Sequence, residues 1–250
     1  MPELITFPDG GFSFLKGGFP YSQGVRAVAG FAIERVRFVR PMPVAMGFAA
    51  IEAHLQAIGR PRTAFCACEL RSPEPFSPQG FKSFNEGYVD VLKDWGLFRD
   101  GVNPVARSNV APEIDPSAEP CFYAFSYSVP AAGAAPTFVV SGSGEWPEGG
   151  KFPQDIVARG DVSAAGMKAK ARFVLERMND RLQGLGASWS EASAVQIYTV
   201  HDIHPLIEDT ILPRTGNGAG LTWHYCRPPI KELEYEMDLR RVQSEKLLNG

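Results

Sequence analysis

Apolar residues recur at helical spacing in three parts of the chain. These parts are residues 48–59, residues 81–95 and, with the strongest pattern, residues 164–185. A repeat of three to four residues predicts an amphipathic α-helix with one apolar face. Gly59 closes the first stripe and Gly186 follows the third, and glycine commonly ends a helix at such a position.

Segments rich in β-branched and aromatic residues lie before, between and after these helices. Such segments, when bounded by proline and glycine, predict β-strands. Residues 1–18 have little periodicity, so we expect them to be extended or hairpin-like, and we expect a short helix over residues 204–211. The predicted strands are residues 21–39, 63–70, a segment starting near Arg107, 121–129, 137–141, 194–200, 221–226 and 232–239.

The order of elements repeats in the second half of the chain. Leu-Gln-Ala-Ile-Gly59 closes the first main helix, Leu-Gln-Gly-Leu-Gly186 closes its counterpart, and a strand follows each. Tandem duplication explains this order better than chance does. Residues 130–136 are small and bounded by prolines, which is typical of a linker. We therefore predict an α+β fold with two tandem domains, residues 1–129 and 137–250, each a mixed sheet with helices packed on one face.

Composition argues against several classes of protein. The 250 residues carry a formal net charge of −3, whereas a general nucleic-acid coat needs a basic face. No apolar run approaches the roughly 20 residues of a membrane span. The N-terminus lacks the basic and then apolar pattern of a signal peptide. We therefore expect a cytoplasmic protein with no membrane partner, and nucleic acid is a disfavoured partner.

The four cysteines predict neither a disulfide nor a metal site. Cys66 and Cys68 share a predicted strand, where residues two apart lie about 6.5–7 Å from each other, too far for an easy disulfide. The sequence has no Cys-x-x-Cys pair for zinc. His201 and His204 could suggest a metal, but their spacing after a strand does not put both on one helical face. We expect buried free thiols and no metal.

One guanidinium stands out in the run Asn-Pro-Val-Ala-Arg107-Ser-Asn-Val. Arg107 follows a proline and a long helical segment, and at the start of a strand it can present a planar pair of donors to a carboxylate. A solvated surface arginine is the simpler alternative. Two further motifs lie upstream, Pro-Tyr21-Ser-Gln and Asn85-Glu-Gly-Tyr88.

Together, these motifs resemble the reactive intermediate deaminase (RidA/YjgF) family, in that family's order. The resemblance covers nearly the whole chain as two successive copies. It implies a chorismate-mutase-like α+β fold, assembly as trimers, and sites in the clefts between neighbouring domains. Many members of this family hydrolyse imines or enamines of 2-oxo acids to the oxo acid and ammonia.

The resemblance also implies roles for individual residues. Tyr21 matches the family's N-terminal tyrosine, Arg107 matches its carboxylate-binding arginine, and Asn109 stands where many members have cysteine. Leu-Glu234-Tyr-Glu-Met is similar to the family's Ile-Glu-Ile-Glu-Ala strand, whose first glutamate is associated with the water. Ser141 belongs to a Val-Ser-Gly-Ser-Gly run that is similar to the family's Val-Ser-Gly-Gln turn.

Each copy departs from the family pattern. The first lacks the Ser-Gly-Gln turn and an acid in its last strand, and the second has Ala219-Gly220 near the position of the arginine. Arg214 lies close enough in sequence to be a substitute. We therefore expect a shared site in which Arg107 anchors a substrate carboxylate and Glu234 of an adjacent domain positions or deprotonates water. Because a protonated imine carbon is already electrophilic, we expect no cofactor.

Other side chains are candidates for the lining of the cleft. Trp223 and Tyr225 share one face of a predicted strand, although a simple division into core and surface is the commoner case. Glu236 follows Glu234 on a face of alternating carboxylates, which a solvated face would also explain. The expected lining residues are Ser141, Trp223, Tyr225 and Glu236.

These expectations favour a hydrolytic deaminase of small imine or enamine carboxylic acids, of the 2-imino acid or aminomuconate type. Its two-domain chains would form a homo-oligomer, a trimer with six domains. The alternative is a non-catalytic protein that binds small carboxylates or regulates a partner, because neither copy alone holds a full set of site residues. RNA cleavage is less favoured, because the chain is acidic and its Lys and Arg residues are not clustered.

Overall fold

Two mixed β-sheets form the centre of the protein in a computed structural model that describes residues 2–249. The seven-stranded sheet has the order β1 (Leu4–Phe7), β2 (Phe12–Leu15), β3 (Gly24–Ala27), β8 (Phe138–Gly144), β12 (Glu236–Arg241), β9 (Ala194–Tyr198) and β10 (Thr222–His224). The six-stranded sheet has the order β11 (Cys226–Arg227), β6 (Ala106–Pro112), β5 (Phe65–Arg71), β7 (Cys121–Pro130), β4 (Phe31–Pro43) and β13 (Ser244–Leu248).

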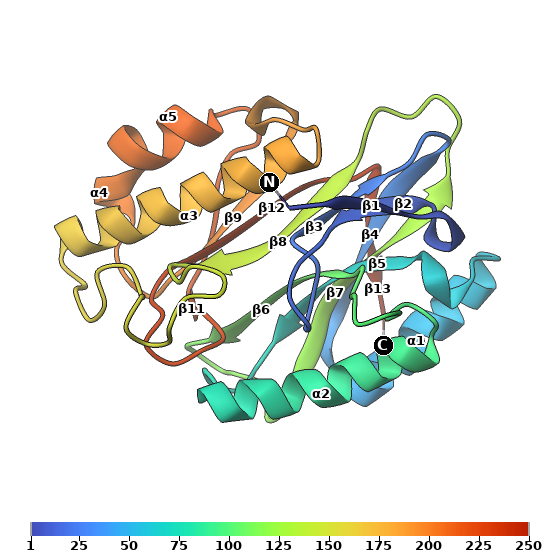
Figure 1. The fold of residues 1–250 in the computed structure, drawn as a ribbon, viewed down its shortest axis with the longest axis horizontal. Helices are drawn as coiled ribbons and strands as arrows, with labels where there is room; N and C mark the ends of the chain where they lie inside the picture. The colour runs from blue at the N-terminus through green and yellow to red at the C-terminus, as the bar shows by residue number, and fades with distance from the viewer. Residues whose placement is uncertain (1, 250) are drawn as a thin grey trace.

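Helices lie on the two outer sides of the molecule, with both sheets between them (Figure 1). α1 (Val44–Ala57) and α2 (Pro78–Asp94) lie on the side of the six-stranded sheet, and α3 (Ala164–Gly184) lies on the other side. Beside α3, a short helical stretch comprises α4 (His204–Leu206), a π-turn (Ile207–Ile211) and α5 (Leu212–Thr215). Short 3₁₀ turns also form at Pro8–Gly10, Arg62–Ala64 and Trp189–Glu191. The predicted α+β fold is confirmed.

The three long helices form where the apolar periodicity predicted them, but two begin earlier than expected. α1 begins at Val44, directly after β4, and α2 begins at Pro78. Ser77 explains the earlier start of α2, because its hydroxyl accepts a hydrogen bond from the backbone N–H of Gly80 at 3.1 Å. Ser163 caps α3 in the same way, at 3.2 Å from Gly166 N. Each cap satisfies a backbone donor that the first helical turn leaves free.

The two sheets exchange strands between the halves of the sequence. β1–β3 come from residues 4–27, yet they extend the sheet built from the second half by pairing β3 with β8. Near the C-terminus, β13 pairs with β4 and extends the sheet of the first half. The predicted division into residues 1–129, 130–136 and 137–250 therefore separates the long helices but not the strands. The N-terminal hairpin itself agrees with the expectation for residues 1–18.

Charged and polar side chains fill the space between the sheets. Arg35 of β4 and Glu69 of β5 form a bidentate ion pair, with Nε–Oε1 and Nη2–Oε2 distances of 2.6 and 2.9 Å. Arg240 of β12 reaches Glu69 at 4.0 Å from the opposite sheet. Ser108 of β6 donates to Asp238 of β12 at 2.5 Å. Polar contacts therefore set how the sheets face each other, in contrast to the apolar contacts beneath the helices.

Replacing Glu69 with glutamine should destabilise the protein by about 3–5 kcal/mol, because Arg35 would keep a buried charge without its bidentate partner. The Arg35 and Glu69 side chains are only 4% and 11% exposed. The change is measurable as the free energy of unfolding in urea. Glu52→Gln is the matched control, because Glu52 pairs with Arg62 at the surface and its loss should cost no more than about 1 kcal/mol. Equal losses in the two variants would contradict this account of the buried pair.

All four cysteines are buried and free, as the sequence predicted. They lie on β5, β7 and β11, among apolar neighbours or next to the sheet interface. Burial raises the pKa of the Cys68 thiol to about 12, although the Tyr88 hydroxyl and Arg107 oppose that rise. These thiols therefore contribute to packing.

Within residues 2–249, the helices are all too short or too polar to cross a bilayer.

Candidate active site

A cavity of about 170 Å³ opens between the two sheets, where β6, β8 and β12 approach the C-terminal end of α3. Both halves of a single chain contribute residues to this cavity. Its polar and charged lining residues are Tyr21, Arg107, Asn109, Ser143, Glu148, Arg181 and Glu236. The apolar lining residues are Pro20, Phe81, Trp146, Pro229, Ile230 and Leu233, and Gly142 and Gly144 complete the wall.

The segment after Tyr21 joins the two sheets at the edge of the cavity. The backbone N–H of Ser22 donates to the carbonyl of Val105 at 2.9 Å, next to β6. On the other side, the Ser141 hydroxyl donates to the carbonyl of Ser22 at 2.6 Å and the Ser141 N–H donates to the carbonyl of Gln23 at 3.1 Å. These bonds fix Tyr21 between β6 and β8. Burial raises the pKa of its hydroxyl, against the opposing effects of Arg181 and Arg107, so Tyr21 stays neutral and able to donate a hydrogen bond.

Arg107 lies on β6 with its side chain enclosed by aromatic rings. The guanidinium carbon is 4.8 Å from the ring centre of Tyr88 and 5.1 Å from that of Tyr21, and Phe81 and Phe84 follow at 5.7 and 5.8 Å. The residue is 2% exposed, so the solvated surface arginine considered as an alternative is wrong. Rings at this distance stabilise the cation but leave its N–H groups without acceptors.

Two nitrogens of the Arg107 guanidinium have no hydrogen-bond partner within residues 2–249. Nη2 donates to the Asn85 side-chain carbonyl at 2.6 Å, whereas Nε and Nη1 are buried and unpaired. The side-chain nitrogen of Asn109 is also buried and unpaired, while its oxygen accepts from Ser72 at 2.9 Å. A buried cation with free donors is costly unless an anion completes its bonds. Arg107 and Asn109 therefore form a site suited to a carboxylate.

Glu236 is the carboxyl group that shares the cavity with Arg107. It begins β12, is 4% exposed and lines the cavity directly. Burial, reinforced by the nearby Asp238 carboxylate, raises the pKa of Glu236 well above its usual value, against the opposing charges of Arg181 and Arg107. A carboxyl group held in its protonated form can act as a general acid near neutral pH.

Gly142 allows this carboxyl group to lie against β8. A Cβ at position 142 would overlap the Glu236 carboxyl oxygen and would lie 3.3 Å from the Ser108 hydroxyl. The glycine in the Val-Ser-Gly-Ser-Gly run is therefore required by the close approach of Glu236.

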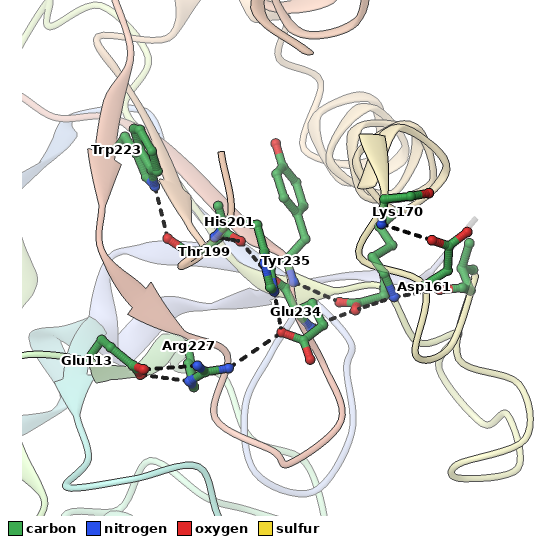
Figure 2. A network of polar contacts seen from close by, with 12 residues as sticks. Glu113, Asp161, Lys170, Thr199, His201, Trp223, Arg227, Glu234 and Tyr235 are labelled. Atoms are coloured by element: carbon green, nitrogen blue, oxygen red, sulfur yellow. Dashed lines mark hydrogen bonds and ion pairs between the residues drawn. The ribbon is translucent and has the colours of Figure 1, made fainter. Parts of the chain in front are cut away.

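Glu234, expected to lie beside Arg107, is not among the residues that line the cavity. Its carboxylate is 2.8 Å from His201 Nε2 and 3.6 Å from Arg227 Nη1, and Arg227 also pairs with Glu113 at 2.7 Å (Figure 2). The expected strand over residues 232–239 begins only at Glu236, because a turn with a positive φ of 79° at Glu232 precedes it. Glu234 and Glu236 therefore do not share a strand face, and the cavity receives the second glutamate of the motif.

A buried carboxylate explains why the strand starts at Glu236. Glu145 accepts the backbone N–H groups of Glu234 and Tyr235 at 2.7 and 3.1 Å (Figure 2). Lys170 of α3 contacts the same carboxylate at 3.2 Å, and both side chains are fully buried. These two donors are consequently bound by a side chain instead of a neighbouring strand. This contact fixes the backbone immediately before Glu236.

Among the remaining predicted site residues, one lies next to the cavity and the others lie away from it. Ser141 is buried next to the cavity, where its hydroxyl also accepts the backbone N–H of Arg107 at 3.1 Å, so its role is to join β8 to β6. Trp223 and Tyr225 are 37% and 50% exposed and do not line this cavity, so their predicted place in a cleft stays a prediction. Arg214, considered as a substitute clamp, lies on α5 and does not line it either.

No group of three or more His, Cys, Asp or Glu side chains is placed to hold a metal ion among residues 2–249. His201 contacts Glu234, whereas His204 Nδ1 contacts Asp202 at 2.6 Å. The two histidines thus bind separate carboxylates.

The lining residues that sequence reasoning missed include Arg181, Trp146 and Glu148. Arg181 falls on the buried face of α3, between Met178 and Leu182, and a cation within an apolar stripe was the available signal. No comparable signal marked Trp146 or Glu148, because they lie in the irregular segment after β8.

The chain is similar to several known proteins. A 2-amino-5-chloromuconate deaminase of Comamonas testosteroni is 48% identical over 252 residues, covering 99% of this chain and 100% of that protein. A chorismatase crystal structure aligns with 96% of this chain and 85% of its own, with a TM-score of 0.53 and 11% identity, which shows the fold alone. The YjgF protein of E. coli aligns with 43% of this chain and 80% of its own, at a TM-score of 0.32 and 15% identity.

A family model described as 2-aminomuconate deaminase CnbZ matches residues 4–246. This match spans every residue that lines the cavity and both sheets except the last two residues of β13. The chain therefore belongs to the 2-aminomuconate deaminase CnbZ family.

Proposed function

We propose that the protein hydrolyses 2-aminomuconate, or a ring-cleavage enamine of the same dicarboxylate class, to the 2-oxo acid and ammonia. Family membership supports the reaction, and the relative from Comamonas supports a substituted aminomuconate as a substrate. Among the functions that the sequence left open, these comparisons favour the deaminase over a carboxylate-binding protein and over a ribonuclease. The expected trimer of two-domain chains stays a prediction.

The observation that carries the proposal is the pairing of an unsatisfied cation with a buried acid in one cavity. Arg107 presents free N–H donors, and Glu236 presents a carboxyl group whose pKa is raised well above its usual value. An enamine of a 2-oxo acid needs both groups, because it carries a carboxylate next to the carbon that reacts. Arg107 and Asn109 would bind this carboxylate, and the Tyr21 hydroxyl would orient the substrate.

Glu236 would transfer protons in each step of the reaction. Its carboxyl group first protonates the enamine carbon, which converts the enamine to an iminium ion and leaves Glu236 as a carboxylate. Water then attacks the C=N carbon while the carboxylate removes a proton from that water, giving a neutral carbinolamine. The re-formed acid protonates the amine, the C–N bond breaks, and the hydroxyl proton returns to Glu236. One water is consumed, one ammonia leaves, and Glu236 ends in its starting protonation state.

Ammonia release from freshly generated 2-aminomuconate tests the function. We expect stoichiometric ammonia and 2-oxo acid, measured with a coupled dehydrogenase and by absorbance. Uncatalysed hydrolysis in buffer, and with heat-denatured protein, provides the controls. A rate equal to the uncatalysed rate, with correctly folded protein, would refute the proposed function.

The raised pKa of Glu236 predicts a pH-dependent difference in stability between wild type and Glu236→Gln. Below the ordinary glutamate pKa of about 4.3, Glu236 is protonated in both the folded and the unfolded chain. In that range the difference in stability between wild type and variant does not change with pH. Above it, the unfolded wild-type chain releases a proton that the folded chain keeps, so wild type loses stability relative to the variant, by at most about 1.4 kcal/mol per pH unit. The loss ends where pH exceeds the pKa in the folded state.

Urea unfolding of both proteins from pH 4 to pH 9 measures this difference. Asp238, Glu145, Arg181 and Arg107 also face Glu236, but they are present in both proteins and largely cancel in the comparison. A difference that stays constant with pH would contradict a protonated Glu236.

A further inference from the structure

A second guanidinium lines the cavity, and it is already paired with a carboxylate of the protein. Arg181 of α3 donates through Nη1 to the carbonyls of Ser141 and Gly142 at 2.9 and 3.1 Å. Its Nη2 donates to Glu148 Oε1 at 2.7 Å. Arg181 thus has one face fixed to β8 and another directed at a carboxylate that lines the same cavity as Arg107.

The two members of this ion pair differ in their access to water. The Arg181 side chain is 5% exposed, whereas that of Glu148 is 52% exposed. Glu148 therefore lies at the opening of the cavity, held on its other oxygen by Gln23 Nε2 at 2.7 Å. Gly149 and Gly150 follow it directly, and Gly149 has a φ of 77° with no atom within 4 Å of a hypothetical Cβ. Breaking the Arg181–Glu148 pair should cost little free energy, because the Glu148 carboxylate is already about half exposed to water.

The charges in the cavity favour such an exchange. Arg107 has free donors, whereas the charge of Arg181 is already balanced by Glu148. One substrate carboxylate satisfies Arg107. A second carboxylate in the cavity would repel Glu148 and compete with it for Arg181, since both anions need the same N–H groups.

We propose that Arg181 is the second carboxylate site of the cavity, and that Glu148 occupies it until the distal carboxylate of a dicarboxylate substrate takes its place. This inference rests on the proposed function, and it assigns a specificity-determining role to the Arg181–Glu148 pair. A dicarboxylate gains two guanidinium partners in the cavity, and a monocarboxylate gains only Arg107. Glu148 acts as a competitor for the distal site and not as a ligand of the substrate.

Two unreactive six-carbon dienes that differ in one carboxylate test the proposal. These are trans,trans-muconate, with two carboxylates, and sorbate, with one. Their dissociation constants would be measured by calorimetry for wild type and Glu148→Gln, which keeps the side-chain shape but removes the competing charge. We expect muconate to bind the variant about three- to fivefold more tightly than wild type, the size expected for losing one partly exposed competing charge. Sorbate affinity should change by less than about twofold.

Glu52→Gln is the control, because it also removes a carboxylate from an Arg–Glu pair but lies on α1 and does not line the cavity. Equal changes for muconate and sorbate, unchanged muconate binding, or weaker muconate binding would each overturn the proposal. Calorimetry does not depend on turnover. If muconate gains affinity selectively but wild type releases no ammonia from 2-aminomuconate, the proposed function fails and the distal site stands.

Discussion

Arg107→Lys should lower kcat/KM for 2-aminomuconate by about 10²- to 10³-fold, mainly through a higher KM. Lysine keeps the positive charge but loses the planar set of N–H donors that can bind a carboxylate in pairs. Removing one partner of a buried, hydrogen-bonded charge pair costs about 2–5 kcal/mol, and each 1.36 kcal/mol corresponds to a factor of ten in rate. The effect should appear in KM because the carboxylate does not change during the reaction.

Steady-state kinetics of Arg107→Lys would be measured beside Arg99→Lys. Arg99 pairs with Asp9 at the surface, at 2.8 Å with both side chains about half exposed, and it does not line the cavity. This control should change kcat/KM by less than about twofold. A KM within about twofold of wild type for Arg107→Lys, with the variant folded, would remove Arg107 from carboxylate binding.

Glu236→Gln should lower kcat by about 10²- to 10⁴-fold, the range for the loss of a general acid–base group. Glutamine has nearly the same shape and can form hydrogen bonds, but it cannot transfer a proton. Substrate binding should be nearly unchanged, because Arg107 and Asn109 stay in place. The measurement is kcat from initial rates, with muconate binding as a check on the cavity.

Glu234→Gln is the matched variant, two residues earlier in the same motif. Its carboxylate contacts His201 and Arg227 outside the cavity, so we expect kcat to stay within about threefold of wild type. A loss in Glu234→Gln as large as the loss in Glu236→Gln would restore Glu234 as the catalytic residue. Catalysis by Glu234 would then require a site that the single chain does not form.

The two halves of the chain complement each other within one molecule. The first half supplies Arg107 and Asn109, and the second half supplies Glu236 and Arg181. The exchange of strands joins the halves mechanically, since β1–β3 extend one sheet while Phe12 and Phe14 pack into the apolar cluster beneath the other. Each half can therefore lack part of the family pattern and still contribute to a complete cavity.

Local sequence patterns were sufficient for the helices and for most strands. The stripe over residues 164–185 predicted α3 almost to its ends, because an apolar face every three to four residues is set by neighbouring positions alone. The same holds for the buried thiols and for the fold class. Pairing between distant strands was not predictable in this way. Nothing in residues 4–27 indicates that they join the sheet of the second half.

The candidate site was likewise predictable from local sequence only in part. The motifs around Tyr21, Asn85 and Arg107 were recognisable in the sequence, and the structure brings all three together: Arg107 contacts Asn85, and its guanidinium lies over the Tyr21 ring. Arg181 was missed although its position within the apolar stripe of α3 was a signal. Trp223 and Tyr225 were included because alternation describes which residues share a face but not which face meets a cavity.

The sequence by itself determined the helices, the α+β class, the buried thiols and Arg107 as the candidate carboxylate-binding guanidinium. Each of these depends on residues close together in the chain or on a local motif. Only the tertiary structure decided that Glu236, and not Glu234, shares the cavity with Arg107. The physical reason is that side chains alternate between the two faces only where the backbone is paired as a strand. The Glu145 carboxylate, 91 positions before Glu236 in the sequence, binds the backbone N–H groups of residues 234 and 235, so strand pairing begins only at Glu236.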